Sequence, residues 1–179
     1  GTKEFSEMKE GDTLEVMGPL GNGFALKEEK AIIIGGGIGI PQMLELAKQL
    51  NVEKTVVLGY RTSTFLKDEF EAVCDVKVAT EDGSQGTKGT VIDAIEKYGV
   101  EGKVIYACGP MPMLKALAVY AEEHGMEAQI SLEERMACGI GACLGCICKT
   151  KEKDHHTNVN NTRICKDGPV FDAKEVVFA

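Results

Sequence analysis

The sequence lacks any run of 18 apolar residues, and we therefore expect no transmembrane helix. Its opening stretch, Thr2-Lys3-Glu4-Phe5-Ser6-Glu7, lacks the apolar segment of a signal peptide. Basic residues are too few to balance the acidic ones: 20 Lys and Arg stand against 28 Asp and Glu, for a formal net charge of −8. Because an acidic protein repels phosphate backbones, we expect no nucleic-acid partner. With neither a transmembrane helix nor a signal peptide expected, we predict a cytoplasmic protein that does not bind the membrane.

Histidine is also scarce. His124 lies near a predicted helix end, and His155 and His156 lie in a polar tract, so we expect all three at the surface rather than in a metal-binding triad. No serine–histidine or paired-carboxylate arrangement indicates hydrolysis. The residues that remain as candidates for chemistry are mostly glycines and cysteines.

Short apolar runs alternate with helical patterns from residue 27 to residue 132. This alternation predicts an α/β domain with a five-stranded parallel sheet of Rossmann-like type. The expected strands are 31–34, 55–58, 75–80, 103–107 and 127–132, and the expected helices are 41–50, 67–72, 90–98 and 110–124.

Residues 1–26 read as the end of something larger. They contain a short predicted helix over Thr2–Met8, a predicted strand over Thr13–Met17 and a glycine-rich turn from Gly18 to Phe24. A lone strand cannot bury its own face, so we interpret this region as the remnant of a domain truncated at its N-terminus.

Residues 133–179 differ in character and form a second, small domain. Glycine and cysteine dominate as far as Cys148, and a polar tract that we expect to be an exposed loop follows. Short strands are expected at 162–165 and 175–178.

Cysteine is concentrated in this small domain: five of the seven fall within the last 42 residues. The odd number, the clustering and the lack of a secretion signal argue against a disulfide scaffold and favour a metal. Four of the cysteines follow the plant-type ferredoxin order, separated by four residues, two residues and then a long interval. The predicted [2Fe-2S] ligands are Cys138, Cys143, Cys146 and Cys165.

Other interpretations of the cysteines stay open. Zinc sites usually use two facing C-x2-C knuckles, of which only Cys143-x2-Cys146 is present, and the thiols could also be free. Cys148 could replace Cys165 as the fourth ligand, because alternate residues of an extended strand point the same way. We favour Cys165, which ends a strand-like run before a turn, and interpret Cys148 as a small buried hydrophobe. The residues between the ligands are small, which suits a loop whose N–H groups point at sulfur; they are Gly139, Gly141, Ala142 and Gly145.

A glycine-rich loop follows the first predicted strand and opens a helix, which is typical of a pyrophosphate site. The dinucleotide fingerprint is only partly matched, because its third glycine is replaced by Gln42 or Ile40, depending on the register. A tight strand–helix turn without a ligand would give the same pattern. The candidate phosphate-binding residues are Gly35, Gly36, Gly37 and Gly39.

Other candidates lie at the ends of later strands, where open α/β sheets bind ligands. The acid expected to bind an NAD ribose is missing after the second strand, where Arg61 could bind an NADP 2′-phosphate or the pyrophosphate, or lie in solvent. Cys108-Gly109-Pro110 ends the fourth strand, and Cys108 could pack against a nicotinamide ring or be a buried core cysteine. The Glu81–Ser84 segment could cover the nucleotide or be a solvated turn.

These motifs together resemble the ferredoxin reductase-like family. More narrowly, Glu134 to Cys146 and Cys165 to Phe171 are similar to the electron-transfer subunits of type B dihydroorotate dehydrogenase. The segments Gly18 to Phe24 and Tyr106 to Pro110 agree with that resemblance, which covers essentially the whole chain.

The resemblance implies an N-terminal flavin barrel, a nucleotide domain and a cluster domain, with FAD, one [2Fe-2S] cluster and NAD rather than NADP. It also implies a catalytic subunit that carries FMN and oxidises dihydroorotate in pyrimidine synthesis, the two subunits forming a heterotetramer. Electrons would pass from FMN through the cluster to FAD and then to NAD+. The barrel is missing here, so this fragment alone is expected to be inactive. Gly1 and Thr2 look like the family's Gly-Thr pair near the FAD phosphates.

Two other functions remain possible at this point. A related flavin and iron–sulfur subunit could act with NAD(P)H on ferredoxin or sulfur compounds. The incomplete fingerprint and the missing barrel would also fit a non-catalytic zinc or redox-sensing module.

Overall fold

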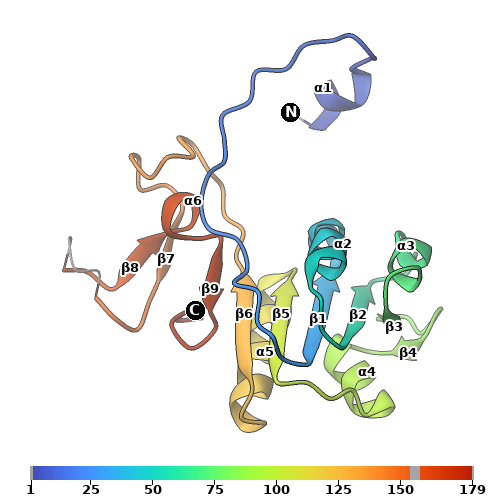
Figure 1. The fold of residues 1–179 in the computed structure, drawn as a ribbon. Coiled ribbons are helices and arrows are strands. Elements are labelled where there is room, and N and C mark those ends of the chain that lie inside the picture. Colours follow the sequence, from blue (N-terminus) through green and yellow to red (C-terminus); the bar gives the residue numbers. More distant parts are fainter. Residues whose placement is uncertain (1, 154–157, 179) are drawn as a thin grey trace.

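The computed structural model describes residues 2–153 and 158–178, so Gly1 and the pair His155–His156 lie outside the described residues. Its centre is a seven-stranded sheet in the order β4-β3-β2-β1-β5-β6-β9 (Figure 1). All neighbours from β4 to β6 are parallel, and β9 runs antiparallel to β6. The strands are β1 (Ala31–Gly36), β2 (Lys54–Tyr60), β3 (Asp75–Thr80), β4 (Thr87–Lys88), β5 (Val104–Cys108), β6 (Glu127–Ser131) and β9 (Val170–Asp172).

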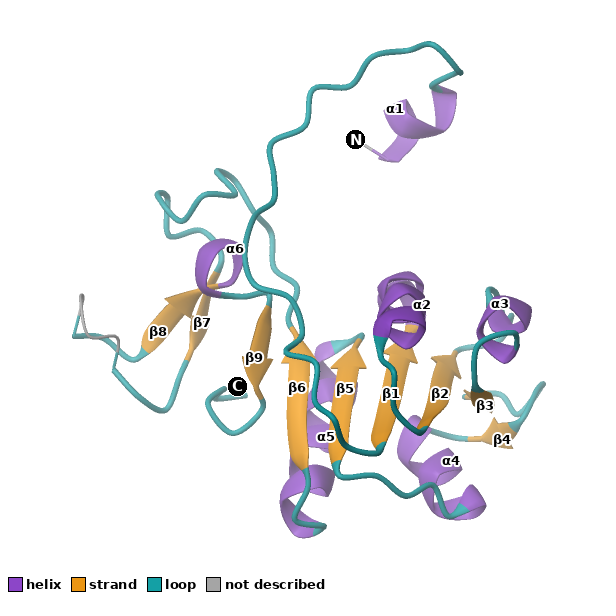
Figure 2. Cartoon of the chain, in the orientation of Figure 1, coloured by secondary structure: helices purple, strands orange, loops and turns teal. Residues whose placement is uncertain are grey.

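Helices cover both faces of the sheet (Figure 2). One face packs against α2 (Ile40–Gln49) and α3 (Lys67–Glu71), and the other against α4 (Val91–Tyr98) and α5 (Met111–Glu123). With the first strand in the middle, the order β3-β2-β1-β5-β6 is that of a doubly wound nucleotide-binding sheet. The predicted five-stranded parallel α/β fold is confirmed, with β4 and β9 added at its edges.

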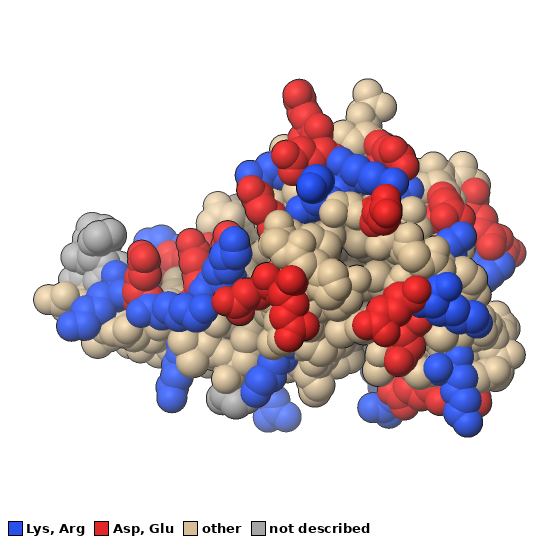
Figure 3. Space-filling view, turned by 90° about the horizontal axis from the view of Figure 1, so that it is seen from below, with Lys and Arg blue, Asp and Glu red and all other residues tan. Residues whose placement is uncertain are grey.

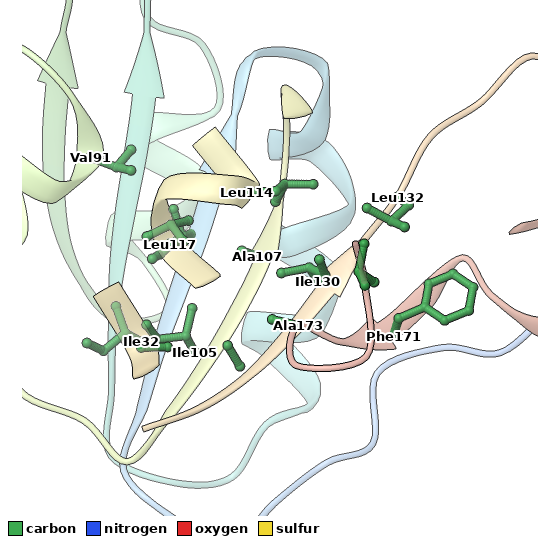
Figure 4. Packing of buried hydrophobic residues seen from close by; sticks show 14 of the residues in the cluster. Ile32, Val91, Ile105, Ala107, Leu114, Leu117, Ile130, Leu132, Phe171 and Ala173 are labelled. Carbon is green, nitrogen blue, oxygen red and sulfur yellow. The ribbon is translucent and has the colours of Figure 1, made fainter. Parts of the chain in front are cut away.

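The core divides by the alternation of side chains along the strands. In β1, Ile32 and Ile34 point to the α4–α5 side, whereas Ala31 and Ile33 point to the α2–α3 side, and all four are fully buried. Figure 4 shows how the first cluster continues toward the C-terminal segment, where Phe171 lies beyond Ile130 and Leu132.

The cysteine-rich segment is built onto this sheet. It leaves β6, forms the hairpin of β7 (Ile147–Lys149) and β8 (Asn161–Arg163), turns through α6 (Ile164–Asp167) and returns in β9 beside β6. The side chains of Cys146, Ile164 and Cys165 belong to the same buried cluster as α5.

The N-terminal segment begins with α1 (Thr2–Glu7) and runs in extended form down to the sheet (Figure 1). It is held there by Asn22, whose N–H donates to the Gly168 carbonyl (2.6 Å), and by a reciprocal pair of hydrogen bonds between Ala25 and the Gln129 amide (2.8 and 2.9 Å). Phe24 packs edge-on against Tyr106 at 5.6 Å between ring centroids. Residues 22–25 therefore strap the segment across β5, β6 and the start of β9.

Three predicted elements are wrong in detail. Residues 13–17 form no strand, and the Val16 side chain is 79% exposed, because no neighbouring strand in the described chain pairs with them. The strand expected at 162–165 is β8 and stops at Arg163, since the next residues turn into α6. The strand expected at 175–178 reduces to one bridge between Val176 and Thr150.

Among the described helices, none combines the length and the apolar character needed to cross a membrane.

Acidic and basic side chains are interspersed on the face seen in Figure 3. His124 is exposed, as expected, and its ring stacks on Tyr120.

Candidate metal centre and dinucleotide pocket

The glycine loop folds as a tight turn between β1 and α2. Gly35 and Gly36 end β1, and a 3-10 turn over Gly37–Gly39 leads into α2, whose second residue is Pro41. A Cβ at Gly39 would overlap the Cys108 carbonyl, and one at Gly35 would lie 3.0 Å from the Ile40 Cα. The loop thus lets α2 begin directly against the ends of β1 and β5.

A pocket of about 690 Å³ opens at the carboxyl ends of β1, β2 and β3. Four predicted nucleotide-binding residues line it: Gly36, Gly37, Arg61 and Pro110. Glu81, from the segment expected to cover the nucleotide, lines it as well. Thr90 and Val91, at the N-terminus of α4, line the pocket too, and the Asp93 side chain caps that end of the helix.

A second pocket, of about 580 Å³, shares Gly36 and Pro110 with the first. Predicted Gly109 lines it, as do Ile38 and the Glu133–Arg135 segment that leads into the cysteine loop. The two pockets are therefore adjacent, and their linings together extend from the end of β3 to the entrance of the cysteine loop. Sequence reasoning missed Ile38 and Glu133–Arg135, because only the fold brings them opposite Gly109.

Cys108 lies beneath these pockets and lines neither of them in the described structure. It is 6% exposed, and its sulfur accepts a hydrogen bond from Gln42 Nε2 at 2.8 Å. Burial raises the pKa of the Cys108 thiol above its usual value, while hydrogen bonds from Ser131 and Gln42 oppose that rise. Cys108 is thus a buried, hydrogen-bonded thiol at the carboxyl end of β5.

The four cysteines predicted as cluster ligands lie around one loop, and each sulfur accepts a backbone N–H. Cys138 Sγ accepts from Ala142 (3.3 Å) and Cys143 (3.4 Å), and Cys143 Sγ accepts from Gly145 (3.4 Å). Cys165 Sγ accepts from Gly141 (3.1 Å), and Cys146 Sγ accepts from the Cys165 N–H (3.4 Å). Such bonds are those that iron–sulfur proteins place on their thiolates.

The sulfurs fall into two adjacent pairs. The Cys143 N–H, the Ile140 N–H and the Cys143 thiol lower the pKa of Cys138 to about 6. The hydrogen bond with Cys146 and desolvation raise the pKa of Cys165. The pairs meet because the consecutive N–H groups of Gly141 and Ala142 point to Cys165 and Cys138.

This donor set fits a cluster of two irons. A [2Fe-2S] cluster has four cysteine ligands shared between two irons, and so matches two sulfur pairs better than one tetrahedral zinc does. The N–H groups that surround the sulfurs favour the anionic thiolates that iron needs.

Cys148 lies apart from this arrangement. It is in β7, opposite Thr162, and its side chain packs against the α4–α5 side of the core. Burial raises its pKa to about 11. The structure therefore brings Cys165, and not Cys148, into the hydrogen-bonded group of sulfurs.

Of Gly1 and Thr2, the two residues expected near the FAD phosphates, the structure describes only Thr2. Thr2 begins α1, which stands at the far end of the extended segment (Figure 1), and Gly1 lies outside the described residues.

Comparison with known proteins agrees with this arrangement. Residues 133–177 match the iron-sulfur cluster binding domain of dihydroorotate dehydrogenase B. The chain is 50% identical over 180 residues to the dihydroorotate dehydrogenase B (NAD(+)) electron transfer subunit of Caldanaerobacter subterraneus subsp. tengcongensis, covering 99% of this chain and 72% of that one. It is 46% identical over 187 residues to the same subunit of Geobacillus kaustophilus, covering 99% and 70%.

A solved structure is also similar. The NADH-dependent reduced ferredoxin-NADP oxidoreductase, studied for flavin-based electron bifurcation, superimposes with a TM-score of 0.84 at 33% identity. The match covers 99% of this chain and 65% of that one. With a doubly wound sheet, a cysteine loop of matching order and half of its residues identical to such a subunit, the chain belongs to the family of dihydroorotate dehydrogenase B (NAD(+)) electron transfer subunits.

Proposed function

We propose that the chain carries electrons between a dihydroorotate-oxidising partner and NAD+ by way of a [2Fe-2S] cluster and FAD, in pyrimidine synthesis. The observation that carries the proposal is the convergence of Cys138, Cys143, Cys146 and Cys165, each with a backbone N–H on its sulfur. The cluster exchanges one electron at a time and NAD+ accepts two as a hydride, so a flavin between them serves both.

The four cysteines are proposed as the cluster ligands. Cys146 and Cys165 are buried, whereas Cys143 is exposed on the outer side of the loop. The cluster would therefore be shielded on the side of the core and approachable on the other.

The larger pocket is proposed to bind NAD(H). Gly36 and Gly37 offer close backbone approach to phosphates, and Arg61 supplies a positive charge at the same edge. The second pocket, beside Gly109 and Pro110, would hold the nicotinamide next to the flavin. Cys108 at the end of β5 and the Gly35–Gly39 turn would support the backbone between the two pockets.

The proposed partner is an FMN-containing dihydroorotate dehydrogenase catalytic subunit, paired with this subunit in a heterotetramer. Three apolar side chains of the cysteine loop support a docking role, because Met136, Ile140 and Leu144 are 48%, 52% and 56% exposed around Cys143. A partner seated there would bring its flavin to the open side of the cluster.

Analysis of iron, sulfide and flavin tests the proposal on the chain extended to the length of its relatives. Iron and acid-labile sulfide in equal amounts, with bound FAD and a rhombic resonance after reduction by NADH, are expected. A colourless protein with stoichiometric zinc would contradict the proposal.

The likeness to the ferredoxin-NADP oxidoreductase supports a second candidate, a flavin subunit that serves ferredoxin. Purification of the tagged chain from its own cells distinguishes the two. Recovery of an FMN protein that oxidises dihydroorotate supports the first function, and recovery of a ferredoxin-linked partner supports the second.

A further inference from the structure

Arg163 lies at the junction of β8 and α6 and joins two parts of the cysteine segment. Its Nε and Nη2 donate to the two carboxylate oxygens of Asp167 (3.0 and 3.4 Å), so the guanidinium is held as a fork. Its Nη1 donates to the Gly141 carbonyl at 3.3 Å. The Arg163 side chain is 27% exposed, so water screens this cation only in part.

The carbonyl that Arg163 contacts belongs to a peptide unit whose N–H donates a hydrogen bond to a cysteine sulfur. The other end of the Gly141–Ala142 peptide is the Ala142 N–H, which donates to Cys138 Sγ at 3.3 Å. Because amide resonance couples the C=O and the N–H, a cation on the oxygen makes the N–H a stronger donor. One peptide thus connects the guanidinium to a proposed cluster ligand.

The orientation of that peptide is fixed on both sides. Gly141 has φ +81°, and a Cβ there would lie 2.9 Å from the Lys166 Cδ, so only glycine fits without displacing that side chain. The Gly141 N–H donates to Cys165 Sγ at 3.1 Å. A rotation of the loop away from Arg163 would therefore break bonds to two sulfurs.

We propose that Arg163 is a positioning residue that raises the reduction potential of the cluster by polarising the Gly141–Ala142 peptide. The proposal rests on the proposed function. Reduction adds negative charge to the cluster and its sulfurs, and a stronger N–H donor at Cys138 stabilises the reduced form more than the oxidised form. Asp167 holds the Arg163 guanidinium in place through two hydrogen bonds. Its negative charge offsets the positive charge of Arg163 at longer range, so the main effect on the Cys138 sulfur comes through the hydrogen-bonded peptide.

A simple charge effect is the competing explanation, and Lys166 provides its control. Lys166 is next to Cys165 in sequence and its side chain lies against Gly141, but it is exposed and no hydrogen bond joins it to the peptide in the described structure. Loss of either cation removes one positive charge near the cluster. Only loss of Arg163 removes the bond to the peptide.

The test is a redox titration of the full-length flavoprotein, followed by the electron paramagnetic resonance of the reduced cluster. Arg163→Met should shift the midpoint potential downward by more than Lys166→Met does, and the difference should persist at high salt, which screens exposed charges. Equal shifts in the two variants, or no shift in Arg163→Met, would overturn the inference.

Arg163→Lys provides a second reading if the methionine variant loses its iron. A lysine keeps the charge but cannot bind Asp167 as a fork and Gly141 together, so its potential should also fall below that of the unmodified protein. An unchanged potential in Arg163→Lys would overturn the inference. Failure of the unmodified protein to hold iron and sulfide would instead contradict the proposed function itself.

Discussion

Gln42 Nε2 donates a hydrogen bond to Cys108 Sγ across 2.8 Å, from the first turn of α2 to the end of β5. In one of the two registers of the dinucleotide fingerprint, Gln42 occupies the position of the third glycine. In that register, the residue that breaks the fingerprint supplies a hydrogen bond to the thiol at the end of β5.

Replacing Gln42 with Met should make the Cys108 side chain more mobile and its thiol easier to reach. The variant loses one hydrogen bond, worth about 1 kcal/mol, and the thiol should be alkylated by iodoacetamide faster than in the unmodified protein. Peptide mass spectrometry of the Cys108 segment measures the rate. Gln49→Met is the matched control, because Gln49 is on the same helix and donates to the exposed Glu45 carboxylate. Equal rates in the two variants would show that Gln42 does not restrain the cysteine.

Cys165→Ser should abolish the cluster, whereas Cys148→Ser should retain it. Cys165 shares hydrogen bonds with Gly141 and Cys146, while Cys148 packs against the core. Iron and sulfide content of the two purified variants checks this expectation. The reverse pattern would make Cys148 the fourth ligand.

Gly39→Ala should destabilise the protein and weaken NADH binding. The added methyl overlaps the Cys108 carbonyl, and a backbone cannot give way cheaply, so a loss of about 1–3 kcal/mol in the free energy of unfolding is expected. Urea unfolding and NADH titration measure the two effects. Gly23→Ala is the control, since a Cβ there meets nothing within 4 Å, and it should cost no stability.

The N-terminus of α4 should give a pH-dependent contribution to stability. Thr90 and Asp93 form a capping box, in which the Thr90 hydroxyl and N–H donate to the Asp93 carboxylate (2.7 and 2.6 Å) and lower its pKa. Thr90→Val should cost about 1 kcal/mol at neutral pH. Because the pKa of Asp93 is lowered on folding, this stabilisation is present above the ordinary carboxyl pKa and is lost as the pH falls through the lowered value.

Unfolding of Thr90→Val and of the unmodified protein at neutral and acidic pH checks this prediction. The difference between the two should shrink as the pH falls. Thr13→Val, in an exposed loop, should change neither value. A difference that stays constant down to low pH would show that the Asp93 carboxylate does not contribute.

The parallel sheet could be predicted because its strands are continuous apolar runs separated by helical patterns. The alternation of Ile32 and Ile34 with Ala31 and Ile33 follows directly from burial on both faces. The four candidate cluster cysteines could also be picked out, since their spacing is a local property of the sequence.

What the sequence did not reveal depends on contacts between distant segments. Val170–Asp172 is a strand only because it pairs with β6. Cys165 lies in α6 rather than in a strand because the Asp167 carboxylate accepts from the Arg163 N–H and the Thr162 hydroxyl, which turns the chain. The second pocket was hidden because Gly109 and Glu133–Arg135 meet only once β5 and β6 lie side by side.

The pairing of β9 with β6 means that the cysteine segment is tethered at both of its ends to neighbouring strands of one sheet. Movement of the segment at its C-terminal end would have to break the pairing of Phe171 with Ile130. The cysteine segment is therefore joined to the edge of the sheet at two neighbouring points. The same pairing ties the cysteine segment to the edge of the sheet at which Gly109 and Glu133–Arg135 line the second pocket.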